Sequence, residues 1–200
     1  MNVYGVDKDP GATQTRVVEA ARAILIAEGA AAVSMRRVAQ AAGITPMAIY
    51  RHFENREALL RYVADSSFVA VARQWTETVR TGTLEEKMFA VLNDYITFAL
   101  DQPRLYEFMF GERREDARMY PSGFRERQSP TLNVLADLLT EAIRDGTFRD
   151  DDVWDVAILL AALVHGLVQL YHGGRIELPP DQFRELCHRS VGRVFHGIKH

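Results

Sequence analysis

Apolar residues recur at three- and four-residue intervals along most of the chain, which is the spacing that one face of an α-helix requires. Near the N-terminus this spacing joins Val17, Ala21, Ile24 and Leu25, and Gly29 stands where the pattern stops. No run shows a convincing apolar and polar alternation of the kind that marks a half-buried strand. The pattern therefore predicts an all-α protein of about nine helices.

Capping and helix-breaking residues set the expected limits of these helices. The first is expected at residues 13–29, two short helices within 34–53, and the others at 55–79, 83–100, 104–110, 124–145, 150–172 and 181–198. Asn55 can cap the fourth helix, and Thr83 with Glu86 fits a capping box at the start of the fifth. Residues 1–12 lack the apolar stretch of a signal peptide and are expected to form a flexible arm. Residues 111–122 are expected to form a loop with weak helical content.

The stretch SMRRVAQAAGITPMAIYRHF, residues 34–53, has the pattern of two short helices joined by a turn. Ser34 and Thr45 stand where an N-cap is expected, and Pro46 follows at a first helical position, where its missing N–H costs nothing. Gly43 can adopt the positive φ that a sharp turn between two helices requires. This is the arrangement of a helix-turn-helix unit.

The two short helices can share an apolar seam and still present a polar outer face. Residues at helical spacing that can form the seam are Val38, Ala39, Ala42, Ile49 and Phe53. The residues left facing outward are Pro46, Met47, Tyr50 and Arg51. An exposed tyrosine beside an arginine suits a DNA groove, where phosphate oxygens accept from hydroxyl and guanidinium groups. A helical hairpin packed into an ordinary all-α core has the same pattern, so both interpretations stay open at this point.

Residues 43–60 resemble the turn, the recognition helix and the start of the following helix in TetR-family transcriptional regulators. The residues that match at the family's spacing are Ala39, Gly43, Tyr50, Phe53, Arg56, Glu57 and Leu59. The resemblance also covers residues 15–29 and 32–39. It implies a helix-turn-helix DNA-binding domain at residues 13–60 and a helical effector-binding and dimerisation domain at residues 61–200.

The resemblance also implies roles for individual residues. Tyr50 and Arg56 are expected to hold phosphates, and Arg51 and Thr45 to supply most of the direct base contacts. Pro46 and Met47 stand where the family often has a polar or basic residue followed by glycine, so apolar contacts from Met47 or Ala48 to a thymine methyl are expected instead. The full set of predicted DNA-binding residues is Ser34, Arg36, Thr45, Pro46, Met47, Ala48, Tyr50, Arg51, His52 and Arg56.

Aromatic and apolar residues are dense between positions 89 and 110, and they can either pack a core or line a cavity. Residues 105–111, together with Val164-His165-Gly166, are similar to the effector domain of a TetR subgroup that carries a His-Gly motif in its penultimate helix. The similarity implies a small, largely apolar effector. The predicted effector-binding residues are Phe89, Tyr95, Phe98, Tyr106, Phe108, Met109, Leu163, His165 and Gln169.

The last two predicted helices carry apolar stripes that can pack within the chain or form a two-fold four-helix interface. The stripe residues are Leu159, Leu163, Leu167 and Leu170 on one helix and Phe183, Leu186, Val191, Val194 and Phe195 on the other. Two DNA-binding units must be held about 34 to 36 Å apart to read successive major grooves. The resemblance implies that this helix pair forms a homodimer interface.

Composition limits the classes of function. With 48% hydrophobic and 26% charged residues, the chain is typical of a globular protein, and its net charge of −3 argues against coating nucleic acid by bulk attraction. Residues 1–61 carry +2 and residues 62–200 carry −5, which suits local phosphate contact by the N-terminal part. The longest clean apolar run, residues 156–164, is shorter than the roughly 20 residues of a membrane span.

The sequence contains no pattern typical of catalysis or metal binding. His165 is interpreted first as a satisfied core group, then as an effector contact and last as a metal ligand, because no zinc-like spacing surrounds it. Asp150, Asp151 and Asp152 are interpreted as a helix start, and Cys187 as a buried thiol in a reducing cytoplasm. No enzyme activity, cofactor, metal or membrane partner is therefore expected.

With the family resemblance, these observations predict a ligand-responsive, DNA-binding transcriptional regulator. The resemblance implies that it is a repressor and binds a palindromic operator as a homodimer. The alternative is a helical small-molecule binding or enzymatic domain in which the helix-turn-helix is only structural. Salt-dependent binding to DNA distinguishes the two.

Overall fold

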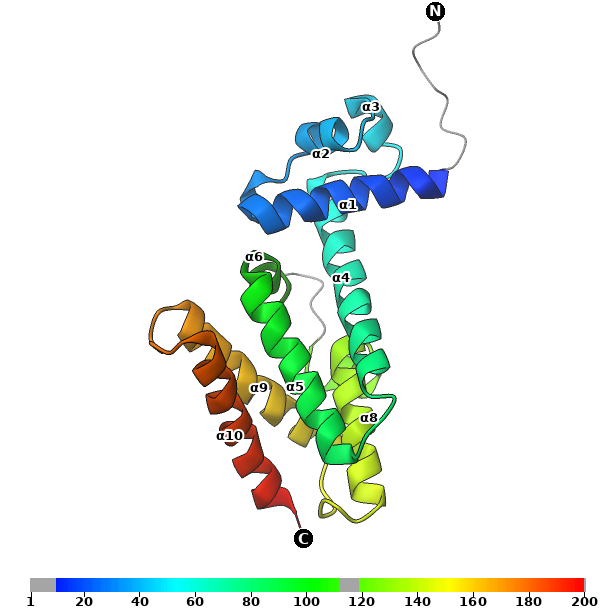
Figure 1. The fold of residues 1–200 in the computed structure, drawn as a ribbon. Coiled ribbons are helices and arrows are strands. Elements are labelled where there is room, and N and C mark those ends of the chain that lie inside the picture. The colour runs from blue at the N-terminus through cyan, green and yellow to red at the C-terminus, as the bar shows by residue number, and fades with distance from the viewer. Residues whose placement is uncertain (1–9, 112–118, 200) are drawn as a thin grey trace, which may run out of the picture. The chain divides into compact units, whose positions relative to one another are not determined.

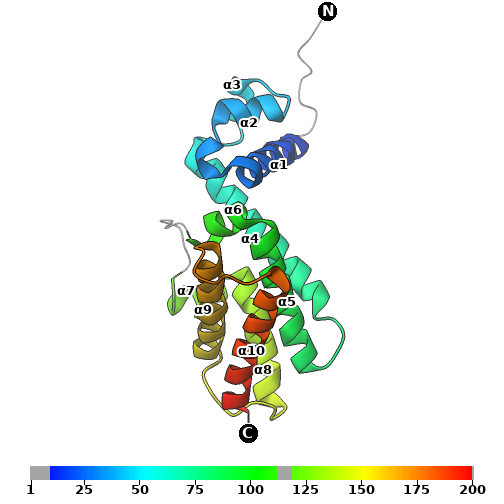
Figure 2. The ribbon, with the colours of Figure 1, turned by 60° about the vertical axis from the view of Figure 1, so that its left-hand side comes forward.

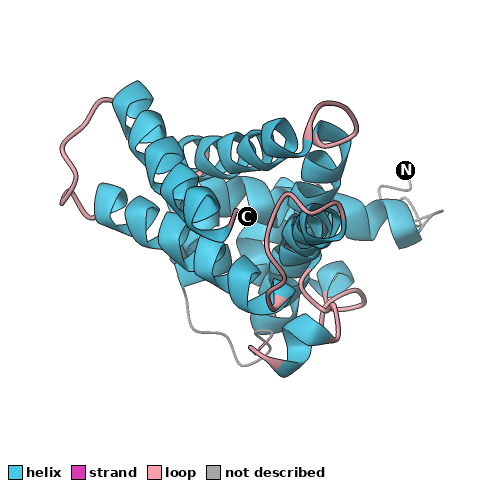
Figure 3. Ribbon diagram, turned by 90° about the horizontal axis from the view of Figure 1, so that it is seen from below, coloured by secondary structure: helices cyan, strands magenta, loops and turns pink. Residues whose placement is uncertain are grey.

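The computed structural model describes residues 10–111 and 119–199. These residues form ten α-helices, one 3₁₀ turn and one π-helical turn, and no strand lies among them (Figure 3). An isolated bridge joins Phe148 to Lys199. The predicted all-α class is confirmed.

The helices follow one another with short connections. The first four are α1 (Pro10–Glu28), α2 (Met35–Ala41), α3 (Pro46–Ile49) and α4 (Arg56–Thr78). They are followed by α5 (Leu84–Asp101), α6 (Pro103–Tyr106) with a π-helical turn (Glu107–Gly111), and α7 (Ser122–Arg125). The last three are α8 (Pro130–Arg144), α9 (Val153–His172) and α10 (Pro180–Ile198).

Local capping explains where several helices begin. The Asn55 side chain accepts from the backbone N–H of Ala58 at 2.8 Å, and α4 starts at the next residue. Thr83 and Glu86 form the predicted capping box, since each accepts from the backbone N–H of the other, at 3.3 and 2.7 Å. Limits set by local hydrogen bonds were therefore predictable from the sequence.

The predicted helix at residues 124–145 was wrong, because two helices occupy this region. α7 ends at Arg125, and α8 begins only at Pro130. A proline disfavours the helical conformation of the residue before it, and Ser129 is accordingly extended, with φ −98° and ψ 102°. Arg127 has φ 60°, and its carbonyl accepts from the Asn133 side chain at 2.8 Å. The chain therefore turns between the two helices.

Two further predictions concern the chain's less regular parts. Residues 10–12 were expected in the flexible arm but belong to α1, and the rest of that predicted arm lies outside the described residues. In the predicted loop at 111–122, Gly111 belongs to the π-helical turn and Ser122 to α7, whereas residues 112–118 lie outside the described residues.

The described residues fall into two compact units. The N-terminal unit comprises residues 10–67 and 102–111, and the C-terminal unit comprises residues 68–101 and 119–199. Helix α4 contributes to both units, and the boundary predicted after residue 60 falls inside it. The segment containing α6 belongs to the N-terminal unit although it follows α5 in the sequence.

The core of the N-terminal unit joins α1, α2, α3, the start of α4 and α6. Helices α2 and α3 lie side by side, with α1 packed against α2 (Figure 1). Tyr106 from α6 is the largest fully buried side chain of the chain's described residues. The Arg104 guanidinium donates to the carbonyl of Ala27 at 2.5 Å and to that of Ile26 at 3.3 Å, so α6 holds the C-terminal end of α1.

In the C-terminal unit, helices α5, α8, α9 and α10 run alongside one another (Figure 2). Helix α5 packs against α8, α8 against α9, α9 against α10, and α10 against α5, which closes a ring of four helices. Among the described residues, α9 alone is long and apolar enough to cross a membrane, with a mean hydropathy of 1.9, and core helices of soluble proteins meet the same criterion.

A polar seam joins α5 to α10 inside this ring. His188 Nε2 lies 2.7 Å from Asn93 Oδ1, and the Arg184 guanidinium donates to Thr97 Oγ1 at 2.9 Å. The Phe89 ring stacks on the His188 ring with centroids 5.0 Å apart. The imidazole is therefore held between an aromatic ring, an amide and a cation.

We expect the stability of the C-terminal unit to fall between pH 7.5 and 5.5 because of His188. Burial, and then the charge of Arg184, lower the pKa of His188 below its ordinary value of 6.5. The unfolded chain therefore takes up this proton at a higher pH than the folded chain, and stability is lost as the pH falls through 6.5.

Urea unfolding at the two pH values measures this effect, and His188→Gln is the comparison because glutamine cannot take up the proton. The variant should lose about 1 kcal/mol at pH 7.5, the value of the hydrogen bond between His188 and Asn93, and should show a smaller fall in stability at pH 5.5 than the natural chain. If the free energy of unfolding falls equally in both proteins between pH 7.5 and pH 5.5, groups other than His188 cause the pH dependence.

Candidate functional site

Side-chain caps hold the helix-turn-helix in shape. Ser34 Oγ accepts from the backbone N–H of Arg37 at 3.4 Å, and Thr45 Oγ1 accepts from that of Ala48 at 3.2 Å. Between the two helices, Gly43 has φ 68°, a conformation that side-chain-bearing residues rarely adopt. The caps and the turn stand where the sequence predicted them.

The predicted apolar seam between α2 and α3 is present. The side chains of Val38, Ala39 and Ile49 are fully buried, and those of Ala42 and Phe53 are nearly so. Helix α3 is only four residues long, and Tyr50, Arg51 and His52 lie in the turn that follows it. The turn is tightened by i to i−3 bonds, from Arg51 N to Ala48 O at 3.2 Å and from His52 N to Ile49 O at 3.0 Å.

The outer face of this unit presents an apolar and an aromatic side chain to solvent. Met47 is 74% exposed and Tyr50 is 53% exposed. The other predicted DNA-binding residues of this stretch are exposed at Thr45, Pro46 and Arg51 and partly exposed at Ala48 and His52. At the start of α2, Arg36 is exposed and Ser34 is partly exposed. Their binding role stays a prediction.

The arginines of the helix-turn-helix fall into two groups. Arg37 donates to both carboxylate oxygens of Glu28, at 2.6 and 3.0 Å, and this contact holds the pKa of Glu28 below its usual value. Arg56 donates to the carbonyls of Val33 at 2.7 Å and Ala30 at 2.6 Å.

Arg36 and Arg51 form the second group. Within residues 10–111 and 119–199, neither side chain makes a hydrogen bond or an ion pair, and both residues are exposed. A guanidinium group in this state keeps all its donors for a phosphate or a base edge. Arg36 and Arg51 are therefore the best placed of these four arginines to bind DNA.

Only some of the predicted effector-binding residues share a neighbourhood. The Tyr95 hydroxyl lies 3.3 Å from His165 Nδ1, and the Trp75 ring is tilted against the Tyr95 ring. Phe98, Leu163 and Gln169 belong to the same C-terminal unit and are partly buried. Phe89 instead lies in the seam with α10, against His188 and Phe195.

The remaining three predicted effector residues, Tyr106, Phe108 and Met109, are buried in the N-terminal unit. The Tyr106 ring is tilted against Phe110 at a centroid distance of 5.2 Å. The density of aromatic residues in the sequence did not indicate that these three residues are buried in the core of the N-terminal unit.

The residues considered for metal or thiol chemistry have structural surroundings. No group of three His, Cys, Asp or Glu side chains that could hold a metal lies in the described part of the chain. Cys187 is fully buried, and burial raises the pKa of its thiol to about 11, so it is a poor nucleophile at neutral pH. Asp152 caps α9 by accepting from the N–H groups of Trp154 and Asp155.

Comparison with known proteins gives the family. Residues 17–63 match the model for bacterial regulatory proteins of the tetR family, and residues 88–194 match the model for the tetracyclin repressor-like C-terminal domain. The chain belongs to the TetR family of transcriptional regulators. Its predicted class of function, a DNA-binding regulator with a helix-turn-helix, is thereby confirmed.

Individual relatives are distant. The chain is 26% identical over 179 residues to ArpR of Pseudomonas putida, described as a probable HTH-type transcriptional regulator, covering 84% of this chain and 82% of that protein. It is 26% identical over 97 residues to the HTH-type transcriptional regulator YobS of Bacillus subtilis. This match covers 48% of this chain and 51% of YobS, so the chain spans about half the length of that relative. In fold it is similar to FadR of Bacillus subtilis, solved in complex with stearoyl-CoA, with a TM-score of 0.68 and 19% identity over 86% of this chain and 96% of that chain.

Proposed function

We propose that this TetR-family chain is a ligand-responsive repressor that binds a palindromic operator as a homodimer. The exposed face of the helix-turn-helix carries the proposal, because Arg36 and Arg51 keep their donors available there while Met47 and Tyr50 project into solvent. On this account the chain acts by binding and not by catalysis, in the cytoplasm, where the operator lies.

The outer face divides into groups that position the protein and groups that read bases. Tyr50 and Arg36 suit phosphate oxygens, since a hydroxyl and a guanidinium donate without regard to sequence. Arg51 and Thr45 supply donors to base edges. Met47, at 74% exposure, offers an apolar surface for the methyl group of thymine.

The homodimer is supported by the outward face of α9. Val156, Leu160 and Val164 are buried inside the unit, whereas Leu159 is 52% exposed and Leu170 is 43% exposed. Large apolar side chains gathered on one exposed helix face mark interaction surfaces in soluble proteins. A two-fold pairing through α9 and α10 covers this face and holds the two recognition segments as a pair.

The effector is proposed to be a small, largely apolar molecule. Tyr95 and His165 supply a polar pair in the C-terminal unit, to which a carbonyl or hydroxyl group of a ligand can bind. FadR, which shares the fold, was solved with stearoyl-CoA, and this supports an apolar ligand for a protein of this shape. The effector can favour release of DNA only by as much as it binds the released state more tightly.

The DNA-binding proposal is tested with genomic fragments selected by the purified full-length protein. We expect Arg36→Ala to lower affinity about tenfold and to reduce the salt slope by about 1.8, because it removes one phosphate contact from each protomer of the homodimer. Arg51→Ala should lower affinity by a similar factor, because it removes a base contact from each protomer. Arg51→Ala should also relax the preference for one fragment over another.

Arg80→Ala is the matched control, because Arg80 is exposed and paired with Glu77 in the C-terminal unit. It should bind like the natural chain. If the natural chain binds no fragment in a salt-dependent way, the proposal fails, and a helical binding or enzymatic domain with a structural helix-turn-helix replaces it.

A further inference from the structure

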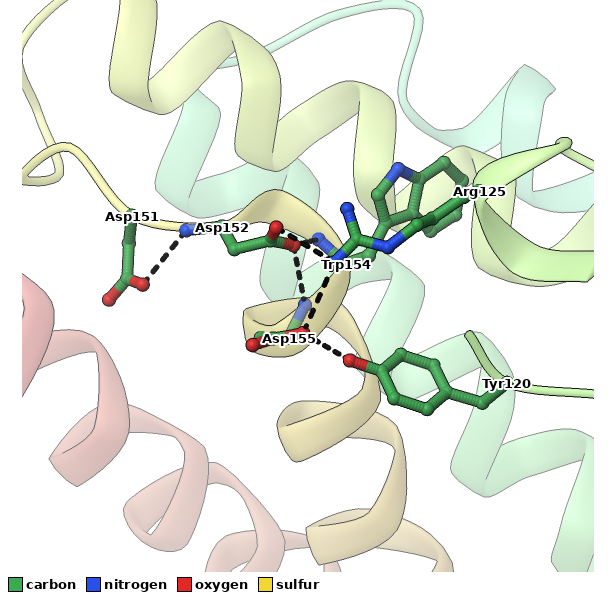
Figure 4. A network of polar contacts seen from close by, with 6 residues as sticks. All are labelled: Tyr120, Arg125, Asp151, Asp152, Trp154 and Asp155. Carbon is green, nitrogen blue, oxygen red and sulfur yellow. Dashed lines mark hydrogen bonds and ion pairs between the residues drawn. The ribbon is translucent and has the colours of Figure 1, made fainter. Parts of the chain in front are cut away.

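Arg125 of α7 shows how this chain compensates the charge of a partly exposed arginine. Its Nη2 lies 2.9 Å from Asp152 Oδ2 and 3.7 Å from Asp155 Oδ1. Figure 4 shows the guanidinium group beside these two carboxylates, together with the Tyr120 hydroxyl, which donates to Asp155. Arg184 on α10 belongs to the same unit, but no carboxylate pairs with it within the described residues.

The Arg184 side chain uses one of its nitrogens and leaves two available. Nη1 donates to Thr97 Oγ1 at 2.9 Å and lies 3.5 Å from the carbonyl oxygen of Asn93, both on α5. Nε and Nη2 make no hydrogen bond within residues 10–111 and 119–199. These two nitrogens form an edge of the guanidinium group that can bind a carboxylate or a phosphate through two parallel hydrogen bonds. Arg184 is therefore a partly buried cation whose free donors suit an anion.

His188 adds a second basic group four residues further along α10, on the same side of the helix. Its Nε2 lies 2.7 Å from Asn93 Oδ1, and its ring stacks on that of Phe89. Burial first, and the charge of Arg184 second, lower the pKa of His188, and no other charged group of the described residues shifts it. A neighbouring carboxylate would raise this pKa instead. Two basic groups therefore lie close together in the polar seam without an acid beside them.

The acidic side chains of the surrounding helices have other partners or are exposed. Within the described residues, those with a partner are Glu85 with Lys199, Glu86 with Thr83, Asp94 with Thr78, Asp155 with Arg125 and Glu185 with Arg189. Asp101 and Asp181 are exposed at the end of α5 and the start of α10. The described part of the chain therefore supplies no anion for the positive charge of the seam.

The donors of the seam are accessible from one side and shielded on the other. Asn93 and Thr97 are four residues apart on α5, as Arg184 and His188 are on α10, so the two pairs meet where the helices are in contact. All four residues are partly exposed, whereas Cys187 next to them is fully buried. An ion can therefore reach the free donors from solvent, and the apolar surroundings strengthen the hydrogen bonds that it accepts.

We propose that the polar seam between α5 and α10 binds a small oxyanion, the phosphate or carboxylate group of a metabolite. The oxyanion accepts from Nε and Nη2 of Arg184, and a protonated His188 balances the second charge of a phosphate group. This site is separate from the proposed effector-binding pair, because Tyr95 contacts Trp75 and His165 on other helices. It gives the C-terminal unit a second ligand, which is recognised by charge and not by apolar contacts.

Titration of the full-length protein with inorganic phosphate tests the proposal. The ring signals of His188, one of six histidines, are followed by NMR at constant ionic strength and at pH 6.5, the ordinary pKa of the group, and are assigned with His188→Gln. We expect a saturable shift of these signals toward the protonated form, because a bound anion favours the charged imidazole. Arg184→Gln should raise the dissociation constant for phosphate about tenfold, the effect of losing one charge-assisted hydrogen bond.

Arg193→Gln is the matched control, because it removes the same charge from an exposed position on α10, and it should leave the dissociation constant unchanged. Arg184→Lys keeps the charge but lacks the planar fork, so it should weaken binding less than Arg184→Gln. Circular dichroism confirms that each variant is folded. If Arg184→Gln does not fold, weaker binding by Arg184→Lys supports the proposal, and unchanged binding overturns it.

A parallel titration with acetate distinguishes the two chemical groups. Saturation by both anions assigns the site to oxyanions in general, and saturation by one alone assigns it to that group. The proposal is overturned if neither anion gives a saturable shift, if chloride gives the same shift, or if Arg184→Gln and Arg193→Gln weaken binding equally.

Discussion

Replacing Tyr106 with alanine should lower the free energy of unfolding by about 3 to 5 kcal/mol, the range for removing a large aromatic side chain from a core. Tyr106 is completely buried in the N-terminal unit, where its ring contacts Phe110. The cavity left by the ring would be bordered by α1 and α6, whose packing supports the helix-turn-helix. Urea unfolding monitored by circular dichroism at the helical band measures the change.

The same substitution at Tyr50 provides a control, because this side chain is 53% exposed. Tyr50→Ala should change stability by less than about 0.5 kcal/mol, as surface substitutions usually do. The sequence placed Tyr106 in the effector site. If the Tyr106→Ala variant is as stable as the natural chain but no longer responds to a ligand, the effector-binding prediction for Tyr106 is right and its structural role is wrong.

The regular helices were predictable because their signals are local. Asn55, Thr83 and Asp152 cap helices through atoms two or three residues away, and the hydrophobic spacing repeats within each segment. The failure at residues 124–145 has a local reason too. Apolar periodicity continues across Pro130, although this proline is the first residue of a new helix.

The surroundings of the candidate sites depend on residues far apart in the sequence, and here local patterns carry less information. Phe89 and Tyr106 look equivalent in an aromatic-rich stretch, yet one contacts α10 and the other is buried with α1 and α6. Arg36 and Arg37 are adjacent, but only Arg37 finds Glu28 at the end of α1. Helical spacing predicts on which side of a helix a residue lies, but it does not predict which residues from other helices contact it.

Arg56→Ala should lower the free energy of unfolding by about 2 to 3 kcal/mol, because it removes two charge-assisted hydrogen bonds, and the partial exposure of the side chain limits the loss. The guanidinium ties the start of α4 to the carbonyls of Ala30 and Val33, which precede α2. The family resemblance instead assigned Arg56 to a phosphate. Urea unfolding of the variant tests the structural role, and the salt dependence of its DNA binding tests the phosphate contact.

Arg56→Lys separates them further, because lysine keeps the positive charge but lacks the planar fork that reaches two acceptors at once. If the hydrogen bonds to Ala30 and Val33 are the main role of Arg56, the lysine variant should lose nearly as much stability as the alanine variant. The dependence of DNA affinity on salt concentration, measured on folded protein, should then be the same in both variants as in the natural chain. If Arg56 holds a phosphate as its main role, alanine should reduce the slope by about 1.8, one phosphate contact for each protomer of the homodimer, lysine should restore the slope, and neither variant should change the free energy of unfolding. Since both Nε and Nη2 already have carbonyl partners within 2.7 Å, the first outcome is the one that the geometry favours.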